Sequence, residues 1–305
     1  MKTILLAVIV AISAFTACND TSSPMTNPME PTNIMATSIN ESTVKLKWTA
    51  SVSEKDTNFK GYILEISSAS GGPMTPMNIL KSQNPISITN LTEGVVYTFS
   101  LKSVTNDGMK SDMAASVNWA PARRFTTPSI RVYEFQSTRG SGLELLNATD
   151  NAPKCLTVID GDRWDLALDT RNDSNEVGSP KASGYTDANY KFNNGKLAKD
   201  FTIYKVIDNV TSLDDIYDSQ AIDKYADSAQ KMVNFTTKTK GFVMLAKTQE
   251  GNFAKIFVKD NSGVILQGTA KDRFIECEIS YQKTKWVPYA SINTGTKVIK
   301  NNSLK

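Results

Sequence analysis

The sequence predicts a mainly β protein with two domains behind a cleavable N-terminal segment. Short runs of alternating apolar and polar residues recur along the chain, separated by turns that contain Gly, Asn or Asp. The chain has 305 residues, which is enough for two domains of ordinary size. Hydrophobic residues make up 40% and charged residues 21%, a balance typical of folded domains rather than disordered chains.

The N-terminus has the features of a secretory signal peptide over residues 1–17. A basic residue, Lys2, precedes an apolar run at 4–15 and two small residues. Residues 15–18, Phe-Thr-Ala-Cys, resemble the lipobox of bacterial lipoproteins, although Phe15 replaces the usual Leu, Val or Ile. The resemblance implies that Cys18 is lipidated, for example with palmitate, and anchors the chain in the outer membrane. An ordinary cleaved signal, in which Cys18 is incidental, is the alternative.

Residues 18–31 are rich in Ser, Thr, Asn and Pro, which predicts a flexible tether between the anchor and the first domain. Only one acidic residue, Asp20, follows Cys18 closely. The sequence therefore shows no surface-export signal, and it leaves open whether the protein faces the periplasm or the cell surface.

Cysteine usage fits an oxidising compartment. Lipidation of Cys18 leaves Cys155 and Cys277, an even number. These two residues either form a disulfide or remain two separate buried thiols, because sequence cannot show whether they approach each other.

The chain contains no histidine, which excludes Ser-His-Asp and Cys-His catalysis within it and any His-containing zinc site. The net charge is only +3, and no basic stripe with interleaved aromatic residues occurs, so nucleic acid is not an expected partner. A hydrolase that uses two carboxylates remains an alternative, but no acidic pair stands out. We therefore expect a protein that is not an enzyme.

The first domain is expected at residues 32–125. Alternating runs predict strands at 44–48, 61–66, 85–88 and 97–104, and the turn Asn106-Asp107-Gly108 follows the last of these. Regular strand spacing with turn signals predicts a β-sandwich. Trp48 and Tyr62 stand where a fibronectin type III module has aromatic residues on its second and third strands, and 91–97 resembles the turn into its tyrosine corner. This resemblance implies an immunoglobulin-like sandwich that serves as a spacer, with a binding role as the alternative.

The second domain is expected at residues 128–290, after a short boundary at 126–129, and a polar tail follows at 291–305. Strands are predicted at 130–135, 163–169, 241–247, 253–258 and 273–281. In the second of these, Trp164, Leu166 and Leu168 should share one face. The long polar stretch 171–195 predicts a functional loop. Residues 211–232 predict a helix with an N-terminal capping signal at Ser212.

This domain resembles the HmuY-like family of haem-binding lipoproteins from Bacteroidetes-type bacteria. The likeness rests on Trp164-Asp165-Leu166-Ala167-Leu168, similar to the family's Trp-Asp-Ile-Ala-Phe strand, and on the Gly- and Asn-rich loop after it. The hairpin at 242–256 and the closing strand at 274–282 add to it. The resemblance implies a β-rich domain with one or two helices that captures haem, or another iron-containing or tetrapyrrole ligand, and works beside an outer-membrane transporter.

Axial haem ligands in this family are paired His or paired Met, and the second domain offers only Met232 and Met244. A thioether is a suitable axial ligand for haem iron. Tyr185 and Tyr190, in the long loop, are alternatives because Tyr can also ligate haem iron. The simpler interpretation assigns the methionines to packing and the tyrosines to covering apolar surface. No metal site beyond the haem iron is expected.

The sequence thus favours a non-catalytic cell-envelope lipoprotein that binds haem or a related iron-containing ligand and passes it to an outer-membrane transporter. The rival hypothesis is a glycan- or protein-binding surface or adhesion module. In that case no pair of metal ligands is needed.

Overall fold

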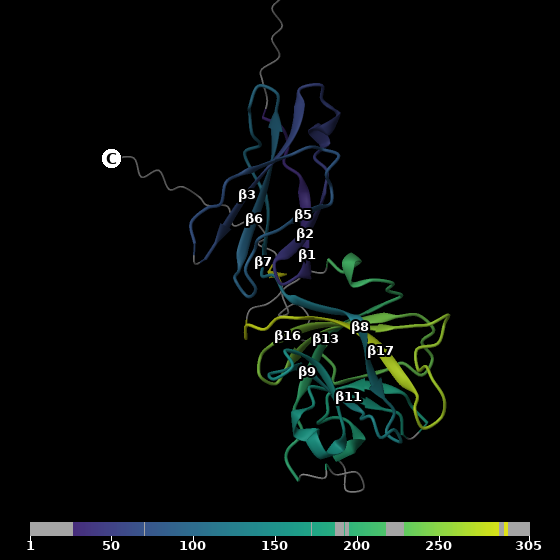
Figure 1. Cartoon of the computed structure of the whole chain (residues 1–305). Coiled ribbons are helices and arrows are strands. Elements are labelled where there is room, and N and C mark those ends of the chain that lie inside the picture. The colour runs from purple at the N-terminus through teal and green to yellow at the C-terminus, as the bar shows by residue number, and fades with distance from the viewer. Residues whose placement is uncertain are drawn as a thin grey trace, which may run out of the picture.

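The computed structural model describes residues 27–69, 71–171, 173–186, 192, 195–217, 229–286 and 290–291. They form two antiparallel β-sandwiches stacked end to end (Figure 1). The predicted signal peptide, Cys18 and most of the predicted tether and polar tail lie outside these residues. Within the described part of the chain, no helix is long and apolar enough to cross a membrane.

The first sandwich pairs a three-stranded sheet with a five-stranded one. The smaller sheet contains, in spatial order, β1 (Thr32–Asn40), β2 (Thr43–Thr49) and β5 (Ile86–Ile88). The larger contains β18 (Ala290–Ser291), β7 (Ala115–Trp119), β6 (Tyr97–Thr105), β3 (Phe59–Ser68) and β4 (Met77–Ile79). The predicted mainly β fold with an immunoglobulin-like first domain is confirmed.

Alternation along the strands builds the first core. Alternate residues of three predicted strands are all buried: Val44, Leu46, Trp48, Tyr62, Leu64, Ile66, Tyr97, Phe99 and Leu101. The Trp48 and Tyr62 rings meet edge to face, with centroids 5.5 Å apart. The Thr92 backbone N–H donates to the Tyr97 hydroxyl over 3.0 Å, which confirms the predicted tyrosine corner.

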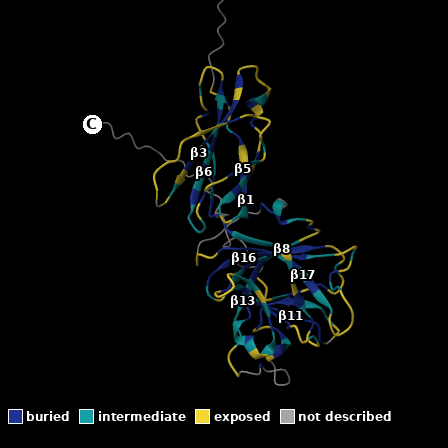
Figure 2. Ribbon diagram, in the orientation of Figure 1, coloured by how far each residue is buried: buried dark blue, intermediate teal, exposed yellow. Residues whose placement is uncertain are grey.

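The second sandwich consists of two five-stranded sheets. One, called here the front sheet, contains β10 (Ala152–Leu156), β9 (Gly142–Asn147), β11 (Leu166–Asp169), β12 (Glu176–Gly178) and β14 (Met232–Asn234). The back sheet contains β13 (Phe201–Asp208), β15 (Phe242–Thr248), β16 (Phe253–Lys259), β17 (Phe274–Tyr281) and β8 (Arg123–Tyr133). Apolar residues of both sheets form one core between them. Figure 2 shows buried residues along the strands of both domains and exposed residues in their loops.

The helical elements in the described residues are short 3-10 turns: η1 (Val52–Lys55), η2 (Val158–Arg163), η3 (Gly184–Thr186) and η4 (Leu213–Asp215). The helix predicted at 211–232 is wrong in the part of this range that the structure describes. The range begins with the 3-10 turn η4 and ends at the first residue of strand β14. Residues 218–228 lie outside the described residues. The predicted cap is present, since the Ser212 hydroxyl accepts from the Asp214 N–H. Leu213 and Ile216 pack on Val243, so their apolar pattern reflects contact with a sheet.

The boundary predicted at 126–129 lies inside β8 rather than in a linker. β8 is the edge strand of the back sheet and pairs with β17. The register shifts there, because Cys277 pairs with Ile130 whereas Ile279 pairs with Phe125. Residues 126–129 therefore bulge opposite Glu278. Pro128 is tolerated because a bulge on an edge strand does not require its missing N–H.

Further contacts join the two domains beside β8. The Gln282 side-chain amide donates to the Pro121 carbonyl over 3.3 Å, and Phe253 packs into the core of the first domain. The Lys255 ammonium lies 4.8 Å from the centre of the Trp119 ring. Trp119 also pairs with Ala290 of β18, so a strand from beyond the second domain completes a sheet of the first.

Trp164 approaches the backbone of β9 at Gly142. An added Cβ at Gly142 would lie 1.7 Å from the Trp164 ring, far closer than any van der Waals contact. Only glycine therefore fits beneath the indole, and both residues are buried.

We expect Gly142→Ala to lower the free energy of unfolding by about 1–3 kcal/mol or more, because the new methyl group overpacks a rigid ring and strand. Urea unfolding followed by circular dichroism measures this change. The control is Gly72→Ala, whose added Cβ would meet open space, and it should alter stability by less than about 0.5 kcal/mol. Equal effects of the two substitutions would contradict the packing described for Trp164.

Candidate functional site

A cleft of about 630 Å³ lies in the second domain between the long polar loop and the turn after β15. Its lining includes Lys181, Phe192, Lys196, Leu197, Ala198 and Gln249. The sequence predicted a functional loop at 171–195, but it did not single out any of these residues. The signal available was the length and polarity of the loop after the Trp164 strand.

An aromatic cluster supports one wall of the cleft. The Trp164 ring contacts Tyr185 and Phe192 edge to face, with centroids 5.2 and 5.1 Å away. Its indole N–H donates to the Thr157 carbonyl over 3.2 Å. These contacts fold the polar loop onto the front sheet and hold Phe192 at the cleft.

Trp164 does not share a face with Leu166 and Leu168, so this prediction is wrong. The strand begins only at Leu166, and Trp164 ends the 3-10 turn η2 before it. Leu166 and Leu168 enter the core between the sheets, whereas Trp164 joins Ala167 on the outer face of the front sheet. Because Trp164 precedes the strand instead of continuing it, its indole lies on the outer face of the front sheet, where it supports the wall of the cleft.

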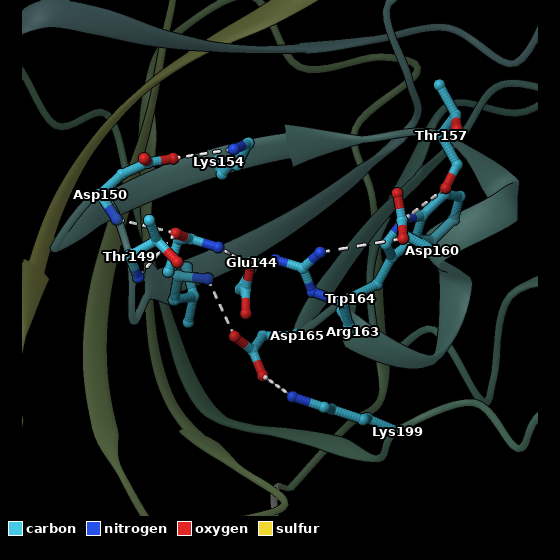
Figure 3. A network of polar contacts seen from close by, with 12 residues as sticks. Glu144, Thr149, Asp150, Lys154, Thr157, Asp160, Arg163, Trp164, Asp165 and Lys199 are labelled. Atoms are coloured by element: carbon cyan, nitrogen blue, oxygen red, sulfur yellow. Dashed lines mark hydrogen bonds and ion pairs between the residues drawn. The ribbon is translucent and has the colours of Figure 1, made fainter.

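A partly buried network of ion pairs lies beside the cleft, and Figure 3 shows two of its members, Asp165 and Lys199. The Lys199 ammonium lies 3.1 Å from an Asp165 carboxylate oxygen and 3.0 Å from one of Glu250. The second Asp165 oxygen accepts from the Leu145 N–H over 2.8 Å. Asp165 belongs to the front sheet and Glu250 to the turn between β15 and β16 of the back sheet, so Lys199 bridges the two sheets.

Burial raises the pKa of Asp165 from 3.8 to about 6, although Lys199 and the Leu145 N–H favour its carboxylate form. The pKa of Lys199 is also raised: burial opposes the ammonium, but attraction to Asp165 and hydrogen bonding to Glu250 outweigh it. Because one lysine occupies both acids, this pair acts as a structural bridge rather than as a free acid and base.

The rim of the cleft carries positive charge on exposed side chains. Lys196 lies 3.0 Å from Asp162 and keeps two thirds of its side chain exposed. Arg163, nearby in the sequence, pairs with Glu144 at 2.6 Å. Among the described residues, no group of three or more His, Cys, Asp or Glu side chains could hold a metal ion.

The ligand residues predicted from sequence do not gather at this cleft. Met244 is fully buried in the core of the second sandwich, and Met232 is half-buried on β14 of the opposite sheet. Tyr185 is buried, and its hydroxyl donates to the Leu168 carbonyl over 3.3 Å. Tyr190 lies outside the described residues. Core packing thus accounts for Met244, and covering of the sheet accounts for Tyr185.

Cys155 and Cys277 are free thiols in the structure, not a disulfide. Cys277 is wholly buried in the core of the second sandwich, and Cys155 packs partly buried against the same core. Burial raises the pKa of Cys155 to about 11 and that of Cys277 well above its usual range. Both residues are therefore neutral, weakly reactive thiols near neutral pH.

Comparison with known proteins bears on the first domain. Residues 29–117 match the family described as "Fibronectin type III domain", which confirms the prediction for this part of the chain. The chain has no match among curated proteins.

Solved fibronectin type III structures resemble the chain. The chicken CNTN1 FN1-FN3 domains are 12% identical, with a TM-score of 0.28; the match covers 31% of this chain and 32% of that one, so the chain spans about a third of its length. The FN5 domain of Drosophila Lar is 17% identical over 31% of this chain and 97% of that one, with a TM-score of 0.25. The third fibronectin III domain of human KIAA0343 is 14% identical over 34% of this chain and 90% of that one, with a TM-score of 0.29.

The raised pKa of Asp165 predicts a specific dependence of stability on pH. The folded carboxyl holds its proton up to about pH 6, whereas the unfolded one releases it near 3.8. The protonated Asp165 therefore stabilises the folded state fully below the unfolded pKa of 3.8, and this stabilisation is lost as pH rises through the folded pKa of about 6. Relative to Asp165→Asn, the wild-type free energy of unfolding should fall by about 2–3 kcal/mol from about pH 4 to about pH 7.

Urea unfolding of both proteins across this range measures the difference. Asp107→Asn is a control of opposite sign, because a hydrogen bond from the Thr105 hydroxyl lowers the pKa of the Asp107 carboxyl. The stabilisation that Asp107 contributes is lost as pH falls. The free energy of unfolding of the wild type, relative to that of Asp107→Asn, should therefore increase as pH rises. A pH-independent difference for Asp165→Asn would show that folding does not raise the pKa of Asp165.

We expect two free thiols in the soluble chain that starts after Cys18. A thiol reagent such as Ellman's reagent should react slowly with the folded protein, because Cys277 is buried and both thiols are protonated. Unfolding without reductant should release two equivalents. No reactive thiol in the unfolded chain would show that Cys155 and Cys277 form a disulfide after all.

Proposed function

We propose that the protein is a lipid-anchored, non-catalytic cell-envelope protein that binds haem, or a related iron-containing tetrapyrrole, in the cleft beside Phe192 and passes it to an outer-membrane transporter. The observation that carries this proposal is the cleft itself, formed by the loop that follows the HmuY-like Trp164 strand. Its volume of about 630 Å³ lies within the usual range of small-molecule sites.

The walls of the cleft suit a flat apolar ligand with acidic groups at its edge. Phe192, Leu197 and Ala198 supply apolar surface. Leu197 is 90% exposed, and covering such a side chain with an apolar ligand is favourable by roughly 1–2 kcal/mol. Lys181 and Lys196 line the same cleft and carry the positive charge that carboxylates such as the haem propionates require, although Lys196 would have to exchange its contact with Asp162 for the ligand.

This arrangement places the binding free energy in the cleft walls rather than in a methionine pair. Met244 could reach a ligand only if the core between the two sheets opened, because its side chain is wholly buried there. Tyr190, which the sequence offers as an alternative axial ligand, lies outside the described residues.

The proposal assigns the first domain the role of a spacer behind the predicted anchor at Cys18. β1 begins at Thr32, and near its other end the Ser38 hydroxyl accepts from the Ala122 N–H at the junction between the domains. The described chain therefore enters the first domain at the end that faces away from the second. A tether attached there would hold the cleft a full domain away from the membrane.

The proposal predicts a saturable, stoichiometric Soret shift when haemin is added to the soluble chain that starts after Cys18. The double variant Lys181→Glu/Lys196→Glu should raise the Kd about tenfold or more, because two attractive charges become repulsive. The control Lys240→Glu makes the same charge change at an exposed lysine before the opposite end of β15 and should leave the Kd unchanged.

Tyr190→Phe should change the spectrum of the oxidised complex if the Tyr190 phenolate ligates the iron, whereas Met244→Ala and Met232→Ala should not change it. No Soret shift in either the oxidised or the reduced form would contradict the haem proposal. A shift that the double charge reversal leaves intact would place haem outside this cleft.

A further inference from the structure

A second cavity, of about 450 Å³, lies at the other end of the second sandwich. Glu134 follows β8, Thr170 follows β11 and Arg273 precedes β17, so the cavity opens where strands of both sheets end. In the antiparallel back sheet this is the end opposite Gln249, which lines the first cleft. We call it the end cavity.

Two bidentate ion pairs give the end cavity fixed walls. Arg273 donates from Nε and Nη2 to one Glu134 oxygen over 3.0 and 2.7 Å, and its backbone N–H donates to the other oxygen over 3.0 Å. Arg171 donates from Nε and Nη2 to the two Asp169 oxygens over 2.9 and 2.7 Å. Because Glu134 and Arg171 are almost wholly buried, neither pair can rearrange freely.

The charges of the end cavity do not favour an anion. Each guanidinium group is already matched by a carboxylate, and Asp173 adds a further negative charge to the lining. The remaining polar lining comes from the neutral side chains of Gln136, Thr170 and Asn175. The cavity thus presents donors and acceptors in fixed positions without a positive surplus, which suits a neutral ligand rich in hydroxyl groups.

The size of the end cavity fits a small ligand, because its volume of about 450 Å³ lies within the usual range of small-molecule sites. Thr170, which lines the cavity, is buried and its hydroxyl has no hydrogen-bond partner in the structure.

An aromatic side chain completes the pattern. Phe135 lines the cavity and is 37% exposed, so part of its ring is open to a ligand. A sugar ring has hydroxyl groups around its edge and apolar C–H groups on its face. Planar polar side chains match the edge, and an exposed ring matches the face. We infer that the end cavity is a binding site for a neutral mono- or disaccharide.

The inference does not depend on the haem proposal, since the two sites share no lining residue. It gives the second domain a carbohydrate-binding end, which would attach the protein to a glycan while the other cleft remains accessible.

Saturation-transfer difference NMR on the soluble chain, with maltose, cellobiose and lactose as separate probes, tests the inference. At least one probe should receive saturation, with the strongest transfer to its ring C–H protons. Phe135→Ala and Asn175→Ala should each reduce the signal at least fivefold. Both residues are incompletely buried, so these variants should fold, and circular dichroism verifies this.

Leu80→Ala, which truncates an exposed apolar side chain in the first domain, should leave the signal unchanged, and so should Lys181→Glu/Lys196→Glu. Absence of transfer to all three sugars would overturn the inference. So would transfer that persists in both Phe135→Ala and Asn175→Ala. Binding of glucuronate or phosphate in place of the neutral sugars would identify an anion site and would equally overturn it.

Discussion

The bridge from Asp165 through Lys199 to Glu250 is the interaction on which the second domain most depends. It joins the front sheet to a turn of the back sheet and fixes the end of the loop segment that leads into β13. Asp165 is buried in this bridge, whereas Lys199 and Glu250 keep 23% and 33% of their side chains exposed. The bridge thus links both sheets to the segment that borders the cleft beside Phe192.

Strand β8 makes the two sandwiches one continuous structure. It begins where the first sandwich ends and continues as the edge strand of the back sheet. The C-terminal part of the chain also contacts the first domain, through Gln282, Phe253 and strand β18. Contacts from two separate parts of the sequence therefore form the junction. Such a junction resists hinge motion, because bending it would break backbone pairing and expose Phe253. If the first domain is the spacer that we propose, this junction would hold the second domain at a set distance from the membrane.

The two proposed sites use different parts of the same sandwich. One lies under a loop that the aromatic cluster of Trp164 holds against the front sheet, and the other lies where the strands end. They approach each other through Arg171, which lines the end cavity and stacks on the Tyr185 ring with its guanidinium carbon 4.0 Å from the ring centre. This contact connects the lining of the end cavity to the aromatic cluster that supports the first cleft.

The sequence by itself determined the strands with clear alternation, such as those around Leu46, Leu64 and Phe99, and the tyrosine corner at Tyr97, because these features are local. It also predicted a functional loop at 171–195. Only the tertiary structure decided that Trp164 leaves the face of Leu166, that the pattern after Ser212 covers a sheet, and that Met244 fills the core. It also brought Lys196 to Gln249 and Arg273 to Glu134. These outcomes depend on which surfaces meet across the chain, and local periodicity carries no information about partners that are distant in sequence.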